Sequence, residues 1–508
     1  MRSRWFTAFT VGLSLALVAG CGSTSHKTAR AKHGNAPNAG GLTAEGGNGA
    51  AAAAGGSTQA SQGGQASGTA SKKSGSSVKS SARGTGAAAP GAPGSAGVSS
   101  AFVPANGPGI TNTDIYMAVG FSSQSAAGDR AIGAGGAAPS YDTRDVFNAV
   151  IKYANAHGGF AGRRLSPIFY DYNLTTNKST QDQAACANYT QDHKVFTIVA
   201  GNDILDECAE KAHAVAVGGG SGTAATYQKF PHLISPDGFR LDRLGNVTAN
   251  GLFKAGYFTG KLGLVTWDDP NYRFAISQGY LPALSSHQLT PTDTAYIVVP
   301  QTIDALSDSS AAISSAITKF RSEGIDHVII QDGPAGVFAG AGLTFEWMNQ
   351  AKSQRWYPRY GQNASNAPGW SVLPSDQMDH AIAIDYSDYD AKYDEGWHPN
   401  ASREKCFKIQ SDAGYPVSSS NLNDEAIAAL SCDLVFFSQQ VINSLSSLSN
   451  DAFVEGTGRL GTAFPPAVVY GDKLVPGRRD GGDLVRTEEY LASCSCLKYS
   501  GPPYSAES

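Results

Sequence analysis

Beyond residue 112 the chain alternates short apolar runs with longer stretches in which apolar residues recur at helical spacing. The apolar runs predict strands at residues 116–121, 165–170, 195–200, 262–267, 295–299 and 327–331. The longer stretches predict helices at residues 143–157, 178–193, 240–259, 272–286 and 309–323. Strands that alternate with helices indicate an α/β protein whose parallel sheets are covered on both faces, with ligands beyond the carboxyl ends of the strands.

The N-terminus has the pattern of an export signal. Arg2 and Arg4 precede an apolar run at residues 5–18, which is too short to cross a bilayer core of about 30 Å. The run ends in Val18-Ala19-Gly20-Cys21, which resembles the bacterial lipobox, where the cysteine is linked to diacylglycerol and becomes the new N-terminus. The alternative is an ordinary secretory signal with a chance cysteine. Lipidation at Cys21 predicts an anchor on the extracytoplasmic face of the cell membrane, and we expect no later membrane-spanning helix.

Composition divides the remainder into a tether and a body. Residues 22–108 hold 54 Gly, Ala or Ser in 87 positions, which leaves too few large apolar side chains to form a core. With a signal peptide at 1–20, the segment 21–108 is predicted to be a disordered tether with a reach of about 50 Å. Residues 109–508 hold 29 basic and 42 acidic side chains, a net charge of −13, which argues against nucleic-acid binding. Their number predicts two lobes of roughly 200 residues each.

Six cysteines remain if Cys21 carries lipid. An even number in an exported chain predicts disulfides, and spacing favours Cys186 with Cys208 and Cys406 with Cys432. Cys494 and Cys496 are separated by one residue, and their pairing stays open. No His or Cys lies near them to complete a metal site.

Four segments of the body occur in an order that resembles a known family. They are 153–171 with its Gly158-Gly159 pair, the strand and turn 264–272, the helix-to-strand passage 320–330, and Tyr357-Pro358-Arg359-Tyr360-Gly361. The chain resembles the type I periplasmic binding proteins, in particular the lipoproteins that bind leucine, isoleucine or valine for ATP-driven import. The resemblance covers most of residues 112–390, whereas residues 390–508 match poorly.

The resemblance implies two doubly wound parallel-sheet lobes joined by three hinge crossovers, near residues 237, 360 and 455. Lobe 1 would hold residues 109–237 and 362–455, and lobe 2 residues 238–361 and 456–508. Strands around Val468 to Tyr470 would return to lobe 2.

The family's pocket is formed by loops that follow strands. In this chain these loops present eight candidate ligand-binding residues: Gln124, Asn202, Asp203, Ser221, Thr223, Tyr272, Asp332 and Asn363. Ser221 and Thr223 lie in a glycine-rich loop whose amides can hold a carboxylate.

One departure concerns the acid that grips the α-ammonium of an amino acid in the family. At its position the chain has Gly361-Gln362-Asn363-Ala364, with no carboxylate. A buried ammonium without a counter-charge costs several kcal/mol. Either Asp203, Asp332 or Asp385 takes over this role, or the ligand is not an amino acid.

Catalytic motifs are weak or missing. The segment 133–138 fits G-x-G-x-x-A but begins 12 residues after its strand, too far for a dinucleotide turn, and the sequence contains no P-loop or H-E-x-x-H. We therefore expect no cofactor, no metal and no enzymatic activity. The favoured hypothesis is a monomeric, lipid-anchored solute-binding protein that takes a small polar ligand, such as an amino acid or amide, to an ABC-transporter permease. The alternatives are a ligand-sensing receptor for a membrane signalling partner and an enzyme on the same scaffold.

Overall fold

The computed structural model describes residues 103–125, 139–218, 222–302, 305–336, 342–363, 373–387, 389, 398–418 and 421–507. The predicted signal peptide, Cys21, residues 133–138 and Ser221 lie outside this set, as does all of the predicted tether before residue 103. Residues 103–108 were also predicted to be a disordered tether, and this is wrong: Ala105 pairs with Leu448, and Val103 packs against buried apolar residues.

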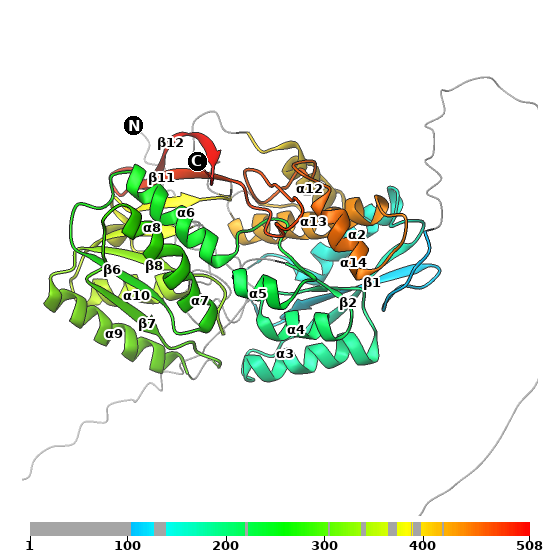
Figure 1. Cartoon of the computed structure of the whole chain (residues 1–508), viewed down its shortest axis with the longest axis horizontal. Coiled ribbons are helices and arrows are strands. Elements are labelled where there is room, and N and C mark those ends of the chain that lie inside the picture. The colour runs from blue at the N-terminus through cyan, green and yellow to red at the C-terminus, as the bar shows by residue number, and fades with distance from the viewer. Residues whose placement is uncertain are drawn as a thin grey trace, which may run out of the picture. The chain divides into compact units, whose positions relative to one another are not determined.

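The first sheet is parallel, with the strand order β2-β1-β3-β4-β5 (Figure 1). Its strands are β1 (Asp114–Phe121), β2 (Arg164–Asp171), β3 (Thr197–Val199), β4 (Val215–Val217) and β5 (Leu233–Ile234). Successive residues of β1 enter different cores: Met117 and Val119 pack on one face of the sheet and Ala118 on the other. This two-sided burial is what parallel strands require.

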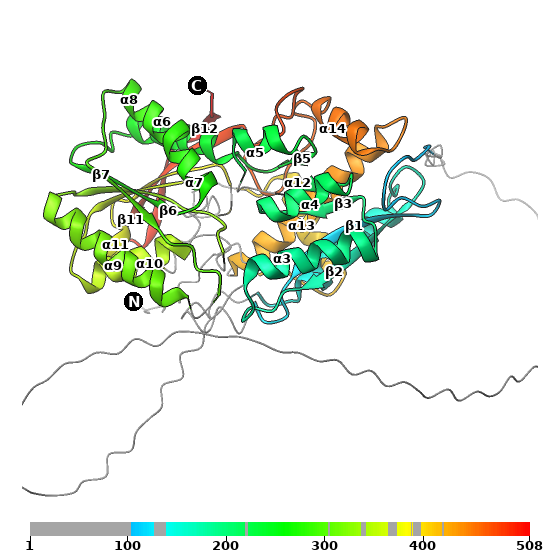
Figure 2. The same cartoon turned by 60° about the horizontal axis from the view of Figure 1, so that its bottom comes forward.

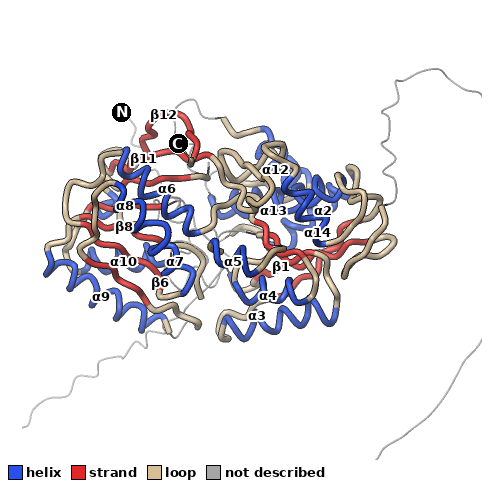
Figure 3. The backbone as a smooth tube through the Cα atoms, in the orientation of Figure 1, coloured by secondary structure: helices blue, strands red, loops and turns tan. Residues whose placement is uncertain are grey.

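Helices cover both faces of the first sheet (Figures 2 and 3). One face packs against α2 (Thr143–Ala156), α12 (Ala401–Asp412), α13 (Leu422–Asn443) and α14 (Asn450–Gly458). The other packs against α3 (Lys178–Ala187), the π-helical η2 (Asn188–Asp192), α4 (Asp203–Lys211) and α5 (Ala224–Lys229). By length and composition Asn423–Asn443 of α13 could cross a membrane, contrary to expectation, but 78% of its apolar window is buried. It is therefore a core helix of this lobe.

The second sheet has the order β12-β11-β10-β9-β8-β6-β7. Its parallel strands are β6 (Leu262–Trp267), β7 (Asp293–Ile297), β8 (His327–Gln331), β9 (Arg359–Asn363) and β10 (Ile382–Asp385). An antiparallel hairpin of β11 (Leu484–Leu491) and β12 (Cys496–Ser505) extends its edge. The parallel part repeats the strand order of the first sheet, which confirms two doubly wound lobes.

Helices also cover both faces of the second sheet. One face packs against α6 (Leu241–Lys254), the π-helical η3 (Ile276–Tyr280) and α8 (Leu281–Ser286). The other packs against α9 (Leu306–Glu323), α10 (Gly342–Ser353) and α11 (Ser375–Met378), while α7 (Pro270–Ala275) follows β6. The buried residues of α9 include Ile313, Ile317 and Phe320, which lie on one helix face at the expected spacing.

The chain crosses between the lobes three times. The first crossing, between β5 and α6, falls at residues 235–240, where it is expected. The second was expected near 360, and this is wrong, because β9 pairs with both β8 and β10. The chain leaves lobe 2 between β10 and α12, so the described residues 362–363 and 373–385 belong to lobe 2. The family resemblance takes Tyr357 to Gly361 as a strand that returns to lobe 1, whereas β9 is a strand of the second sheet.

The third crossing follows α14, and the chain re-enters the second sheet as β11. A strand at 468–470 was expected, and this is wrong as well: Val469 makes only an isolated bridge to Ser387. The returning strands are the hairpin β11–β12.

Disulfides join Cys186 of α3 to Cys208 of α4 and Cys406 of α12 to Cys432 of α13. These are the pairings that spacing favours. A third disulfide joins Cys494 to Cys496 in the turn between β11 and β12.

Candidate functional site: the facing strand-end loops

Each sheet has its topological switch point beside its first strand, at β1 and β3 in lobe 1 and at β6 and β8 in lobe 2. Ligands of doubly wound sheets bind outside the carboxyl ends of the strands at such points. The described loops there are 122–125, 200–203, 268–270 and 332–336.

Asn202 and Asp203 begin α4 after β3. The Asn202 side chain accepts hydrogen bonds from the backbone amides of Ile204 and Leu205, both at 3.1 Å, and so caps the helix. Asp203, the first helical residue, is exposed and turns its carboxylate to the other lobe. Asn202 therefore caps a helix, while Asp203 lies exposed where the two lobes meet.

Asn271 of α7 joins the two lobes directly. Its Nδ2 donates to Asp203 Oδ1 at 2.8 Å, and its Oδ1 accepts from Thr226 Oγ1 of α5 at 3.1 Å. One side chain of lobe 2 thus holds two helices of lobe 1. We call Asn271, Asp203 and Thr226 the clasp. Sequence reasoning missed Asn271 as a site residue, although it lies in the turn after β6 beside the candidate Tyr272.

A second contact between the lobes involves Gln301 in the loop after β7. Its backbone carbonyl accepts from the amide of Lys178 at 3.0 Å, and its side chain accepts from Ser179 Oγ at 3.2 Å. Both partners lie at the N-terminus of α3. The strand-end loops of the two lobes are therefore in contact at two places.

Thr223 is fully buried and caps α5. Its Oγ1 accepts from the Thr226 amide at 3.3 Å and lies 3.1 Å from the Thr226 hydroxyl. The Thr223 hydroxyl therefore caps α5 and also positions the Thr226 hydroxyl, which belongs to the clasp.

Tyr272 is buried, and its hydroxyl donates to the carbonyl of Pro334 at 3.0 Å. Burial, reinforced by Asp332 and Asp269, raises the pKa of this phenol well above its usual value. Tyr272 fixes the loop after β8 to the start of α7.

Asp332 and Asn363 organise the interior of the same lobe. The carboxylate of Asp332 accepts from Trp267 Nε1 at 3.1 Å, from the Gly333 amide at 2.8 Å, and from the amide and hydroxyl of Thr344 at 2.8 and 2.9 Å. Burial raises the pKa of Asp332 to about 7, although these donors oppose the shift. Asn363 is buried at the end of β9 and donates to the Asp332 carbonyl at 3.3 Å.

Gln124 lies in the loop after β1. It is exposed, and its side-chain oxygen accepts from the Leu174 amide at 3.3 Å. Ser122 Oγ donates to the Tyr172 carbonyl at 2.9 Å, so both residues tie this loop to the loop after β2.

The predicted residues thus fall into separate groups. Asp203 and Thr223 lie at the clasp beside Asn202; Tyr272, Asp332 and Asn363 frame the loops of lobe 2; Gln124 belongs to the β1–β2 edge. Among the described residues no group of His, Cys, Asp or Glu is arranged to hold a metal ion.

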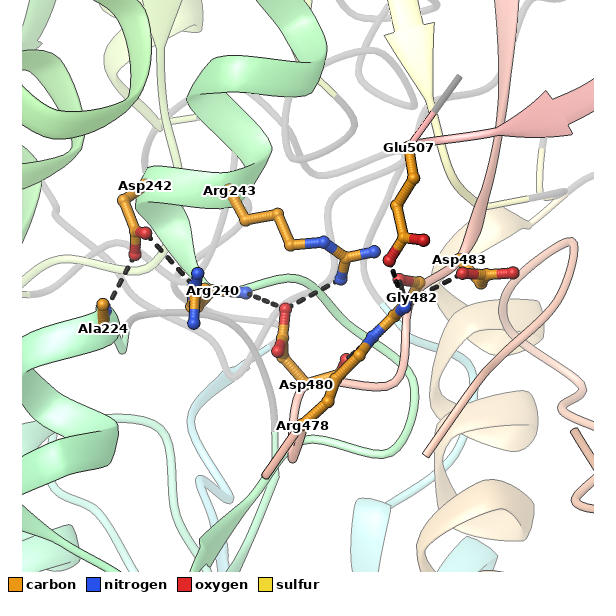
Figure 4. A network of polar contacts seen from close by, with 9 residues as sticks. All are labelled: Ala224, Arg240, Asp242, Arg243, Arg478, Asp480, Gly482, Asp483 and Glu507. Atoms are coloured by element: carbon orange, nitrogen blue, oxygen red, sulfur yellow. Dashed lines mark hydrogen bonds and ion pairs between the residues drawn. The ribbon is translucent and has the colours of Figure 1, made fainter. Parts of the chain in front are cut away.

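At the hinge, residues 478–483 of the third crossing run beside the first crossing (Figure 4). Asp480 accepts from Arg243 Nη1 at 2.8 Å and from the Arg240 amide at 3.3 Å, both at the start of α6. Its neighbour Arg479 donates to lobe 1, to the carbonyls of Tyr227 and Phe230 among others, the latter at 2.8 Å. Adjacent residues therefore hold different lobes.

Arg478 secures the same segment to the C-terminus. It donates to Asp483 Oδ1 at 2.9 Å and to Glu507 Oε1 at 2.7 Å. The hinge is thus held by paired charges (Figure 4).

Two doubly wound lobes, joined by three crossings and facing each other with their strand-end loops, define the type I periplasmic binding protein fold. No family model and no curated protein matches this sequence. Solved structures of ABC-transporter substrate-binding proteins do match its fold.

One is the protein from Desulfitobacterium hafniense in complex with Leu, with a TM-score of 0.51 and 13% identity over 76% of this chain and 100% of that one. A branched-chain amino acid ABC transporter protein from Thermus thermophilus with bound valine has a TM-score of 0.54 and 14% identity, over 77% of this chain and 96% of that one. A solute-binding protein from Rhodopseudomonas palustris HaA2 with p-hydroxybenzoic acid has a TM-score of 0.55 and 11% identity, over 77% of this chain and 97% of that one.

Proposed function

We propose that this chain is a non-enzymatic solute-binding protein of an ABC importer, which captures a small polar ligand by closure of its lobes. The observation that carries the proposal is the clasp, in which Asn271 reaches from the strand-end loop of one sheet to two helices of the other. A cleft whose walls meet through polar contacts suits a ligand that favours the closed state. The bound molecules named for the similar structures support a small organic ligand.

The three acids considered for an ammonium group differ in availability. Asp332 is fully buried and already accepts four hydrogen bonds, while Asp385 is buried and accepts from the amide and hydroxyl of Ser387 at 2.8 and 2.9 Å. Asp203 is exposed where the two lobes meet. If the ligand is an amino acid, Asp203 is the acid to hold its ammonium; otherwise the ligand is a carboxylate or amide without one.

We further propose that Cys21 carries the lipid that holds the protein on the extracytoplasmic face of the cell membrane, with the segment from 22 to 102 as a tether to the permease. The lipobox and the glycine-rich composition support this. A Cys21→Ser variant should leave the membrane fraction and appear in soluble form. Retention of this variant in the membrane would contradict lipid anchoring.

The ligand can be sought with the soluble Cys21→Ser chain. Thermal shift against amino acids, amides and short carboxylates should identify a stabilising compound, because a ligand at 100 times its Kd adds about 2.7 kcal/mol to stability. Native mass spectrometry should detect one ligand per chain. If no small polar molecule stabilises the chain, the transport hypothesis fails.

A matched pair of ligands then separates the two classes. For an amino-acid ligand, Asp203→Asn should weaken binding of the amino acid and leave binding of its desamino analogue unchanged. Asp145→Asn, at an exposed position of α2, is the control. Equal loss for both compounds would assign Asp203 to the clasp alone.

A further inference from the structure

The three disulfides differ in their exposure to solvent. Cys406 and Cys432 are 0% and 1% exposed, and Cys208 is 4% exposed. Cys494 is an exposed residue at the tip of the β11–β12 hairpin. A thiolate in solution can therefore reach the sulfur of Cys494, whereas at least one sulfur of each other disulfide is shielded.

The size of the closed ring also differs. The disulfides of α3–α4 and α12–α13 close segments with sequence separations of 22 and 26, while Cys494 and Cys496 are separated by 2. In the chain-entropy model a disulfide stabilises the fold more when it closes a longer loop. The ring at 494–496 therefore contributes least to folding and is the easiest to open.

The backbone of this ring is itself unfavourable. Ser495 has φ of 50°, in the left-handed region that non-glycine residues rarely occupy. Opening the ring frees Ser495 to leave this conformation, which favours the reduced state.

The hairpin does not depend on the disulfide. Its strands are paired from Leu484 opposite Ser505 to Leu491 opposite Cys496, and Tyr490 and Leu497 are buried against the lobe. The reduced hairpin therefore keeps the two thiols next to each other, so that oxidation can restore the disulfide without refolding.

We propose that Cys494 and Cys496 form a redox-active disulfide that exchanges with an extracytoplasmic dithiol. A thiolate of the dithiol attacks Sγ of Cys494 and forms a mixed disulfide. The Cys494–Cys496 bond breaks, and its electron pair leaves on Cys496 Sγ, which takes a proton from water. The second thiol of the partner then attacks its own sulfur in the mixed disulfide and releases the Cys494 thiolate. The partner is oxidised to a disulfide and the pair is reduced to a dithiol, a two-electron exchange.

The test uses the folded Cys21→Ser chain, equilibrated in buffers with graded ratios of reduced to oxidised dithiothreitol. Free thiols are alkylated and assigned by peptide mass spectrometry. We expect half-reduction of the 494–496 pair at a ratio at least tenfold lower than for the other two pairs. Far-UV and near-UV circular dichroism should be unchanged at this point, and removal of the reductant under air should restore the pair.

A Cys496→Ser variant provides a second measurement, since it leaves Cys494 as a free thiol. This thiol should react with a chromogenic disulfide reagent in the folded chain at a rate within tenfold of that in the denatured chain. The proposal is refuted if all three pairs are reduced at the same ratio, or if Cys494 reacts only after denaturation. The double variant Cys494→Ser/Cys496→Ser should fold and melt like the parent, and unfolding of the hairpin in it would also overturn the proposal.

Discussion

Replacing Asn271 with alanine removes the clasp without touching the hinge. The substitution deletes the hydrogen bond to Asp203 at 2.8 Å and that from Thr226 at 3.1 Å. Thr226 keeps its contact with the Thr223 hydroxyl, and Asp203 is exposed to water, so neither partner is left as a buried unpaired group. The change should therefore act on lobe closure more than on folding.

The magnitude follows from the two contacts. A hydrogen bond contributes a net stabilisation of about 0.5 to 1.5 kcal/mol. The bond from Asn271 to the Asp203 carboxylate stays within this range, because the carboxylate is exposed to water. The sum is about 1 to 3 kcal/mol, which lowers the ratio of closed to open chains about 5- to 150-fold.

Hydrogen exchange of the ligand-free chain measures this ratio. Peptides that cover α5 and α7 should exchange faster in Asn271→Ala by the same factor, while a peptide of the buried strand β6 should be unchanged. Once a ligand is known, its apparent Kd should rise in parallel, because only the closed state holds it on both sides. Asn349→Ala is the control, since Asn349 is exposed and donates only to Phe345 within its own helix.

A double-mutant cycle gives the decisive comparison. If Asn271 acts through Asp203, the variant Asn271→Ala/Asp203→Ala should be less affected than the sum of the single changes. Full additivity would show that Asn271 does not act through Asp203, and unchanged exchange in Asn271→Ala would show that the clasp does not hold the lobes together.

Three further results are expected. Burial raises the pKa of Asp332 to about 7 and that of Asp472 to about 8, so the fold favours the neutral form of both carboxyl groups. The free energy of unfolding in urea should therefore be highest below pH 4. It should fall by up to about 1.4 kcal/mol per pH unit for each group as the pH rises toward 8. Asp472→Asn should flatten this slope, and an unchanged slope would refute its assignment. Asp480→Asn removes the negative charge that faces Arg243. Because the side chains of Asp480 and Arg243 are only 4% and 13% exposed, the change should lower the free energy of unfolding by about 3 kcal/mol. A melting temperature equal to that of the parent would contradict a stabilising role of this ion pair at the hinge. Loss of the α12–α13 disulfide in a double Cys→Ala variant should cost about 3 kcal/mol in calorimetry at constant pH, and no loss would contradict its structural role.

Periodicity predicted the longer apolar parallel strands, but it did not predict the short strands Val215–Val217 and Ile382–Asp385, although both are buried at every position. The strand Leu262–Trp267 is buried at every position, and such runs are unmistakable in a sequence. The strand Arg359–Asn363 is also central, but it is polar. Its buried Gln362 and Asn363 donate to Met378 Sδ and to the Asp332 carbonyl, and the resemblance assigned this strand to the wrong lobe. Burial of polar residues depends on partners that are distant in sequence, which a local pattern does not contain.

The site was harder to predict than the fold for a chemical reason. Hydroxyl, amide and carboxylate side chains after a strand are suited to ligands, and the same groups are preferred as helix caps. Asn202 and Thr223 have the cap geometry, and the carboxylate of Asp332 accepts from donors of β6, the loop after β8 and α10. Asn271 makes hydrogen bonds to the other lobe. Its partners come close only when both lobes are folded, so the local sequence does not distinguish Asn271 from its neighbours.

Hinge and clasp converge on one short helix. The amide of Ala224 at the start of α5 donates to Asp242 of α6 at 2.8 Å, and the Thr226 hydroxyl in its middle donates to Asn271. At its end, Arg479 donates to the carbonyls of Tyr227 and Phe230. Lobe 2 and the third crossing thus hold α5 along its whole length. The glycine-rich loop directly before α5 is where the sequence predicts a carboxylate to bind. A ligand held there would act on a helix of lobe 1 that contacts both lobe 2 and the third crossing, so ligand binding and lobe closure would be coupled through α5.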